Sequence, residues 1–440
     1  MPRSSLPEPA PEPIAGPFLK VEDLQVRYGG LAAVDGLSLC VEAGEVFGLI
    51  GPDGAGKTST FHVLAGVMEP SAGTVRLGGR PPRRARSEIG YLTQRFSLYP
   101  DLSVEENLRY VAGLRQVPVA DYRRRRQGLL ERMGLEPFSF RLAGALSGGM
   151  KQKLALCCAL IDTPELLLLD EPTSGVDPVS RREFWDVIAS LAAEGVTIVV
   201  ATPYLDEAER CGRIAMLQAG RIRRSGTPVA LKRGLGLVRL ELRCPRLAEA
   251  ERLLEQSMAG ADVQTFGDRL DVLVADAEAG RARVEELFRQ HDLPLEGLEV
   301  APPTLENVFV SHLRQELTQP PALPFPRDPR RRPPEGEAIT ARRLSRRFGT
   351  FEAVRHLDLR VGYGEIFGLL GANGAGKTTT IKMLCGLLPP SSGEVVLAGQ
   401  QGDLRRGGLL QRIGYMSQKF TLYDDLSILQ NLEFYAGVYQ

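Results

Sequence analysis

Two glycine-rich runs in this sequence have the residue types needed to hold a phosphate group. The first is Gly51-Pro52-Asp53-Gly54-Ala55-Gly56-Lys57-Thr58 and the second is Gly371-Ala372-Asn373-Gly374-Ala375-Gly376-Lys377-Thr378. Both fit the pattern G-x-x-x-x-G-K-[ST], in which backbone N–H groups surround an anion closely because glycine carries no Cβ. The sequence therefore predicts two phosphate-binding loops.

The side chains that end each loop can complete a nucleotide site. Lys57 and Lys377 can reach the outer phosphates as point charges, and Thr58 and Thr378 can offer a hydroxyl to Mg²⁺ at the positive end of a helix. We also assign the next residues, Ser59 and Thr379, to nucleotide contact. The expected ligands are the phosphates of a nucleotide and Mg²⁺.

Each loop needs a strand before it and a helix after it. The apolar stretches Glu45–Ile50 and Glu365–Leu370 are typical of buried parallel strands, so we expect the strand-loop-helix arrangement twice. A purely structural glycine turn is the alternative, but it does not explain two full motifs in the same context.

Bulk composition limits the class of protein. A chain of 440 residues has room for two or three domains, and its 54 basic and 54 acidic residues give no overall charge for nucleic acid or an anionic membrane. The local basic runs 83–86, 123–126 and 330–332 fit solvated faces and a linker, or contact with lipid head groups.

The six cysteines lack C-x-x-C spacing and indicate reduced core residues of a cytosolic protein. With no apolar run of membrane-spanning length and no leader pattern, we expect neither secretion nor an integral membrane protein.

Changes in composition and hydrophobic pattern along the chain suggest five segments. We expect a disordered N-terminus at 1–17, a first α/β domain at 18–234, an accessory α+β module at 235–318, a linker at 319–337 with seven prolines, and a second, partial copy of the first domain at 338–440. The accessory module has the pattern β-α-β-β-α-β followed by a short helix at 305–317. The two copies match from Tyr28 to the run that contains Gln94 in the first, and from Phe348 to the run that contains Gln418 in the second.

Further motifs follow the first loop in a fixed order. Leu146-Ser147-Gly148-Gly149-Met150 begins a helical run, and an apolar strand at 166–169 leads into Asp170-Glu171 and then Ser174-Gly175-Val176-Asp177. With Gln94, this set resembles an ABC-type ATPase, a P-loop NTPase of α/β fold. The resemblance covers residues 18–234 and, for the first half of the pattern, 338–440.

The resemblance implies a role for each motif. Asp170 would hold Mg²⁺, Glu171 would polarise the attacking water, and Gln94, like Gln418, would sense Mg²⁺ and the γ-phosphate. Ser147, Gly148 and Gly149 would contact the γ-phosphate that the opposite ATPase unit holds, so that two units close head to tail around two ATP molecules.

Simpler structural interpretations exist for the same residues. Asp170 and Glu171 could end a strand, and Ser147 could only cap a helix. Tyr28 and Phe348 could be core aromatics, although the family stacks an aromatic residue at this position on adenine. We favour stacking for both.

One position departs from the family pattern. Pro203 follows the strand at 196–201, where a histidine is expected, and proline has no side-chain donor and no N–H. We therefore expect the first site to bind ATP but to hydrolyse it slowly. Met150 replaces a common glutamine, and we expect it to be tolerated.

The second repeat stops at Gln440, before any signature, catalytic glutamate or switch residue. The chain can therefore offer one facing pair, the Lys377 loop with the Ser147 signature, and that pair has no glutamate of its own. We expect weak ATPase activity and a natural gene that continues beyond Gln440.

Two functions compete for this architecture. A soluble tandem ATPase acting on ribosomes or nucleic acid would typically carry Asn-His-Leu-Asp at the D-loop and a long charged helical linker, and this chain has neither. The segment 302–309 resembles the C-terminal extension of drug-exporter ATPases that work with ABC-2 type permeases. The resemblance thus implies the motor subunit of a multidrug or other small-molecule exporter. It would lie in the cytoplasm on the inner face of a bacterial membrane, with permease subunits and a second ATPase unit, in cis or as a homodimer, as partners and without nucleic acid.

Overall fold

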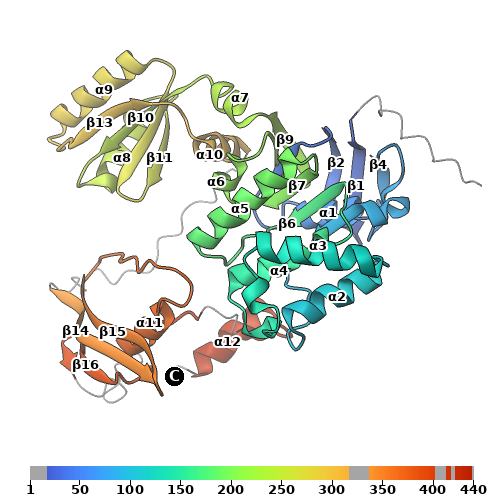
Figure 1. Cartoon of the computed structure of the whole chain (residues 1–440). Coiled ribbons are helices and arrows are strands. Elements are labelled where there is room, and N and C mark those ends of the chain that lie inside the picture. Colours follow the sequence, from blue (N-terminus) through green and yellow to red (C-terminus); the bar gives the residue numbers. More distant parts are fainter. Residues whose placement is uncertain (1–16, 317–335, 402–412, 418–421, 439–440) are drawn as a thin grey trace, which may run out of the picture. The chain divides into compact units, whose positions relative to one another are not determined.

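The computed structural model describes residues 17–316, 336–401, 413–417 and 422–438. The chain divides into two compact units (Figure 1). The first holds the first phosphate-binding loop and the accessory module, and the second holds the second loop. None of the helices in the described ranges combines the length and apolar character that a bilayer span requires.

A six-stranded sheet forms the centre of the first unit. Its strands, in spatial order, are β5 (Ile89–Leu92), β6 (Leu166–Asp170), β7 (Thr197–Thr202), β3 (Val46–Ile50), β8 (Arg213–Gln218) and β9 (Arg221–Gly226). The first five are parallel, and β9 runs antiparallel to β8. All residues of β6 and β7 are buried, because both faces of a parallel sheet are covered.

The two faces of this sheet belong to different apolar cores. Leu167 and Leu169 of β6 point into one core and Leu166 and Leu168 into the other, as the two-residue period of a strand requires. The first core is closed by α2 (Val104–Leu114), α3 (Val119–Arg132), α4 (Gly148–Leu160), α5 (Pro178–Ala193) and α6 (Leu205–Ala208). The second is closed by α1 (Lys57–Leu64) and an antiparallel sheet of β2 (Leu31–Val41), β1 (Leu19–Tyr28) and β4 (Ala72–Leu77).

The accessory module follows α7 (Pro228–Arg233) and has the element order predicted from its sequence. It consists of β10 (Val238–Arg243), α8 (Leu247–Ser257), β11 (Asp262–Phe266), β12 (Arg269–Val274), α9 (Ala277–Gln290), β13 (Gly297–Ala301) and α10 (Leu305–Glu316). The strands form one antiparallel sheet in the order β11-β12-β10-β13, and α8 and α9 pack on its apolar face.

The second unit repeats only part of the first domain. It contains β14 (Glu337–Phe348), β15 (Phe351–Gly362), α11 (Lys377–Leu384), β16 (Ser392–Leu397), β17 (Gln400–Gln401) and α12 (Ile428–Val438). The sheet β15-β14-β16-β17 is antiparallel and corresponds to the β2-β1-β4 sheet of the first domain.

The predicted strand at Glu365–Leu370 is wrong. Residues 365–370 form no strand, and Ile366 and Leu370 are 100% and 92% exposed. In the first domain β3 hydrogen-bonds on both sides, to β7 and β8. Among the described residues of the second unit no strand corresponds to β7 or β8, so this apolar stretch has no ladder partner there.

Candidate nucleotide-binding site

The first loop connects β3 to α1, and two of its glycines are required by close contacts. A Cβ on Gly51 would lie 2.3 Å from the carbonyl oxygen of Leu217, and one on Gly56 would lie 2.4 Å from that of Ala33. Gly56 also has a φ of 103°, which side-chain-bearing residues rarely adopt. The neighbouring strands therefore force the chain into the tight turn whose N–H groups begin α1.

Lys57 is buried at the base of this loop. Its Nζ donates to the carbonyl oxygens of Gly51 at 2.8 Å and Pro52 at 3.0 Å, and it lies 3.5 Å from Oε1 of Glu171. The side chain is 4% exposed, so its charge depends on these partners. The Lys57 ammonium is therefore held between the loop and Glu171, the candidate for the catalytic carboxylate.

Glu171 contacts two of the predicted residues, Lys57 and Gln94. It follows β6, its N–H donates to the carbonyl oxygen of Ala201 at 2.8 Å, and its φ is 48°. Gln94 Nε2 donates to its Oε2 at 3.0 Å. A non-glycine residue in the left-handed region is strained, and such strain persists where surrounding contacts fix the geometry. Lys57, Gln94 and Glu171 thus form one cluster.

Asp170 is fully buried, and neither carboxylate oxygen accepts a hydrogen bond of good geometry within the described residues. Burial raises its pKa, the nearby Thr58 hydroxyl opposes the rise, and Glu171 adds to it. An unsatisfied buried carboxylate beside a threonine hydroxyl is an oxygen donor set that suits a hard cation. Asp170 and Thr58 therefore fit the predicted Mg²⁺ site.

Sequence reasoning missed Tyr91, which lies behind this carboxylate. Burial and then the charge of Asp170 raise the pKa of its hydroxyl. Its ring packs against Phe61 and His62 of α1, with 6.4 Å between centroids in both cases. The signal was its place in β5, the strand paired with β6. Tyr91 links the helix after the loop to the carboxylate.

Tyr28, at the end of β1, lies beside the loop rather than in the core. Its ring is 50% exposed, and its hydroxyl donates to Ser59 Oγ at 3.4 Å and to Met68 Sδ at 3.7 Å. An exposed ring anchored next to the phosphate-binding helix offers a flat apolar surface for a base.

The second loop repeats the backbone geometry without the surrounding carboxylates. Lys377 Nζ donates to the carbonyl oxygens of Gly371 at 2.6 Å and Ala372 at 2.7 Å, and a Cβ on Gly376 would lie 2.4 Å from the carbonyl oxygen of Ala353. The loop lines a cavity of about 800 Å³ with walls that include Phe348, Gly374, Thr378 and Thr379. Phe348 is 46% exposed, with the Arg346 guanidinium 4.8 Å from its ring centroid. Gln418 lies outside the described residues.

A family comparison decides the class of this site. The model of the ABC transporter family, ABC_tran, matches residues 34–174 and 354–440. The chain belongs to this family. It is a P-loop NTPase of the ABC type, with ATP-binding and ATPase function.

Named relatives of the chain are ATP-binding subunits. Over 96% of its length it is 38% identical to "Probable multidrug ABC transporter ATP-binding protein YbhF" of Escherichia coli (strain K12), of which it covers 74%. It is 36% identical over 70% of its length to "Nod factor export ATP-binding protein I" of Ralstonia nicotianae, covering 98% of that protein. It is 37% identical over 64% of its length to "Daunorubicin/doxorubicin resistance ATP-binding protein DrrA" of Streptomyces peucetius, covering 88%.

The signature of this ABC ATPase begins α4. Ser147 is the N-cap, and its Oγ accepts the N–H of Met150 at 3.3 Å. A Cβ on Gly149 would lie 2.6 Å from Cβ of Ser180, so α5 requires glycine there. The hydrogen bonds of Ser147 in the described structure lie within its own helix, and none joins it to the Lys57 loop.

The segment around Pro203 is held by residues that the sequence did not single out. Pro203 directly follows β7, and Tyr204 N–H donates to Thr202 Oγ1 at 3.0 Å. The guanidinium of Arg181 lies 4.6 Å from the Tyr204 ring centroid and 3.7 Å from Glu207, which is buried and accepts from the Thr173 hydroxyl. Because β7 also supplies the carbonyl of Ala201 to Glu171, a backbone hydrogen bond connects this segment to the cluster of Lys57, Gln94 and Glu171.

Proposed function

We propose that this chain is the motor subunit of an ABC exporter that works with separate ABC-2 type permease subunits on the cytoplasmic face of a bacterial membrane. The printed names of relatives describe drug resistance and export, which supports efflux of small molecules as the coupled process. No relative quoted above supports the alternative of a soluble ATPase that acts on ribosomes or nucleic acid.

The observation that carries the proposal is a segment that connects the catalytic cluster to a surface groove. Gln94 donates to Glu171, and its neighbours Thr93, Arg95 and Phe96 line a cavity of about 270 Å³. A carboxylate that changes partners during turnover would move this segment, and the groove would pass that motion to whatever occupies it.

The groove has an apolar wall suited to a short helix of a partner. Tyr99 and Tyr110 stack edge to face with 5.0 Å between centroids, and Leu114 and Tyr110 are 66% and 43% exposed. Exposed aromatic and aliphatic side chains gathered in a concave site are typical of helix-in-groove recognition. The occupant we infer is a cytoplasmic helix of the permease.

The hydrolytic roles follow from the first site. Asp170 and Thr58 would hold Mg²⁺, which neutralises phosphate charge when bound. Lys57 would contact the outer phosphates, Glu171 would orient and polarise water, and Gln94 would sense the state of the site. Within the described residues no hydrogen bond joins Ser147 to the Lys57 loop of its own domain, and in this scheme a second ATPase unit, in cis or in a homodimer, supplies the facing signature.

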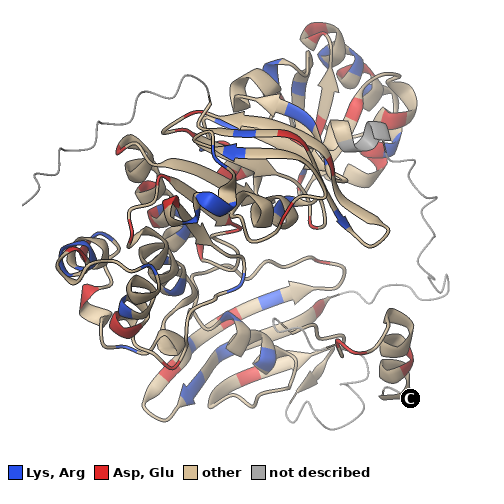
Figure 2. Cartoon of the chain, turned by 90° about the vertical axis from the view of Figure 1, so that its right-hand side faces the viewer, with Lys and Arg blue, Asp and Glu red and all other residues tan. Residues whose placement is uncertain are grey.

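The charge distribution gives no reason to add nucleic acid as a partner. Basic and acidic residues are interspersed along the described helices and strands in Figure 2, in keeping with 54 of each in the sequence. A protein that binds nucleic acid would instead gather basic residues on one face.

A co-purification experiment tests the proposal. The chain should co-purify with an ABC-2 permease encoded beside it, and Leu114→Glu should abolish the association while ATP binding persists. Val229→Glu is the matched control, since Val229 is 52% exposed on α7 and outside the groove. Equal loss with both variants, or no association of the unaltered chain, would refute this function.

A further inference from the structure

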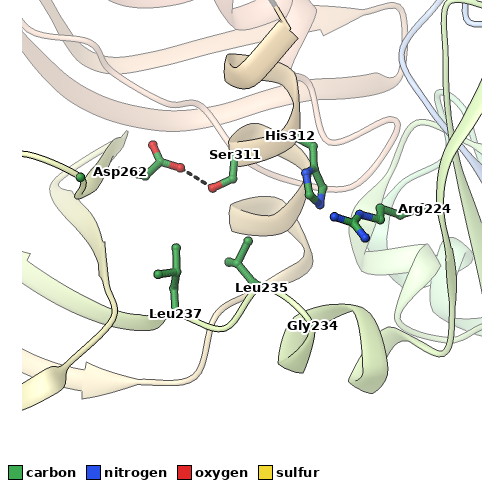
Figure 3. Close-up of a pocket in the computed structure, with 8 residues that line it drawn as sticks. Arg224, Gly234, Leu235, Leu237, Asp262, Ser311 and His312 are labelled. Carbon is green, nitrogen blue, oxygen red and sulfur yellow. Dashed lines mark hydrogen bonds between the residues drawn. The ribbon is translucent and has the colours of Figure 1, made fainter.

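A cavity lies where the accessory module meets the first ATPase domain, away from the nucleotide site (Figure 3). Its volume is about 420 Å³. The ATPase domain contributes Arg224 from β9, and the segment that joins α7 to β10 contributes Leu235 and Leu237. The module contributes Asp262 from β11 and Ser311 and His312 from α10.

The walls of this cavity are fixed because α10 is held from both sides. Leu305 and Val308 are buried in the apolar core of the ATPase domain. Asn307, with no exposed surface, donates to Gln264 Oε1 and Asp271 Oδ2 in the module, both at 3.0 Å. Moving α10 would break a buried polar network, which is costly. The cavity is therefore preformed, as small-molecule sites usually are.

One end of the cavity is rich in N–H donors. The side chains of Arg224 and His312 line this end and point toward each other in Figure 3. Within the described ranges the side chain of Arg224 makes no hydrogen bond or ion pair. A guanidinium presents two parallel N–H groups that match a carboxylate or phosphate. This end therefore suits an anionic group.

The middle and far end differ in character. Leu235 and Leu237 form an apolar wall beside the donor end. At the far end, Asp262 accepts from the Ser311 hydroxyl and from Gln264 Nε2 at 2.7 Å, so its charge is already hydrogen-bonded. From one end to the other, the cavity wall thus offers N–H donors, then apolar side chains, then polar groups. This order is complementary to an amphiphilic ligand.

We propose that this cavity binds a small organic anion, with its carboxylate or phosphate between Arg224 and His312 and its apolar body against Leu235 and Leu237. Such a ligand touches both the ATPase domain and the module. Its binding stabilises their docking by mass action and makes the module an effector-sensing part of the subunit. The binding site does not depend on the proposed export function.

Histidine NMR tests the site directly, because the sequence has four histidines, His62, His291, His312 and His356. The probes are phenyl phosphate, inorganic phosphate and phenol. Phenyl phosphate should shift the His312 ring resonance saturably and more tightly than inorganic phosphate, and phenol should not shift it. His62, on the helix after the Lys57 loop, reports phosphate in that loop separately.

Arg224→Ala should weaken the phenyl phosphate response of His312 by about tenfold or more, the range for a hydrogen bond to a charged group. Arg233→Ala is the matched control, because Arg233 is exposed on α7 and does not line the cavity. An unchanged response in Arg224→Ala, equal affinity for phosphate and phenyl phosphate, or parallel shifts of all four histidines would overturn the proposal.

Discussion

The two phosphate-binding loops share a motif but differ in everything that surrounds it. Lys57 is buried and meets Glu171, which Gln94 also contacts, whereas Lys377 contacts only the carbonyls of its own loop among the described residues. The glycine turn alone therefore sets the shape of a loop. A strand on each side of β3 and a carboxylate at the end of β6 give the first loop the surroundings that the proposed hydrolysis needs.

The largest expected difference between the loops is in backbone protection. Amides of β3 should exchange with solvent deuterium more slowly than those of residues 366–370, by a factor on the order of 10³ or more, because only β3 has ladder partners. Peptide-level exchange mass spectrometry measures this. Equal exchange in the two segments would contradict the comparison.

Glu171→Gln should separate binding from hydrolysis. ATP hydrolysis should fall by about 10² to 10⁴, the range for loss of a positioned acid–base group. ATP binding should persist, because the amide still accepts from Gln94. Phosphate release and nucleotide binding are the two readouts. A rate unaffected by Glu171→Gln would show that ATP is not hydrolysed at the first loop.

Pro203→His tests whether the first site hydrolyses ATP slowly because it lacks one hydrogen-bond donor to the γ-phosphate. Turnover should rise, up to about 10²-fold, if the new imidazole reaches the γ-phosphate. Steady-state ATPase assays at saturating Mg-ATP check it. The control is Pro203→Ala, which restores an N–H but no side-chain donor. A rise with alanine equal to that with histidine would show that backbone, not the imidazole, limits the rate.

Lys57→Ala and Lys377→Ala compare the loops residue by residue. Lys57→Ala should weaken ATP binding about tenfold or more, and it also leaves Glu171 without its cation. Lys377→Ala removes only the contacts of an exposed loop, so its effect on folding should be smaller. Nucleotide titration and thermal unfolding of both variants provide the test, and identical losses of stability would contradict the difference in burial.

Asp170→Asn should have the smallest effect on the unliganded protein, and in the stabilising direction. Burial raises the pKa of Asp170, so the folded state holds a proton more tightly than the unfolded state. Stability is then lost as the pH rises from the ordinary aspartate range through the raised pKa. The substitution should remove that decline and add about 1 kcal/mol at neutral pH. It should also abolish stabilisation by Mg²⁺ with ATP. Unfolding curves against pH, with and without Mg-ATP, measure both effects.

Much of the first site could be predicted because its residues lie in short motifs. The loop, Asp170, Glu171 and Gln94 were assigned before their contacts were known, and Lys57, Glu171 and Gln94 do lie together. Tyr91 and the Arg181–Tyr204–Glu207 cluster were not assigned, because each is brought to the site by strand pairing or helix packing rather than by a motif. The accessory fold followed from alternation and helical periodicity, yet the docking of α10 on the ATPase domain through Leu305 and Val308 did not.

The sequence by itself determined the chemistry. Glycine spacing dictates a turn that surrounds phosphate, and an Asp-Glu pair after an apolar run dictates carboxylates at a strand end, since both depend on local backbone geometry. The tertiary structure decided which loop lies beside the Glu171 carboxylate and the Gln94 amide. The apolar stretch before the second loop is nearly the same in composition as the first, but it forms no strand, because a strand exists only where other strands satisfy its N–H and C=O groups.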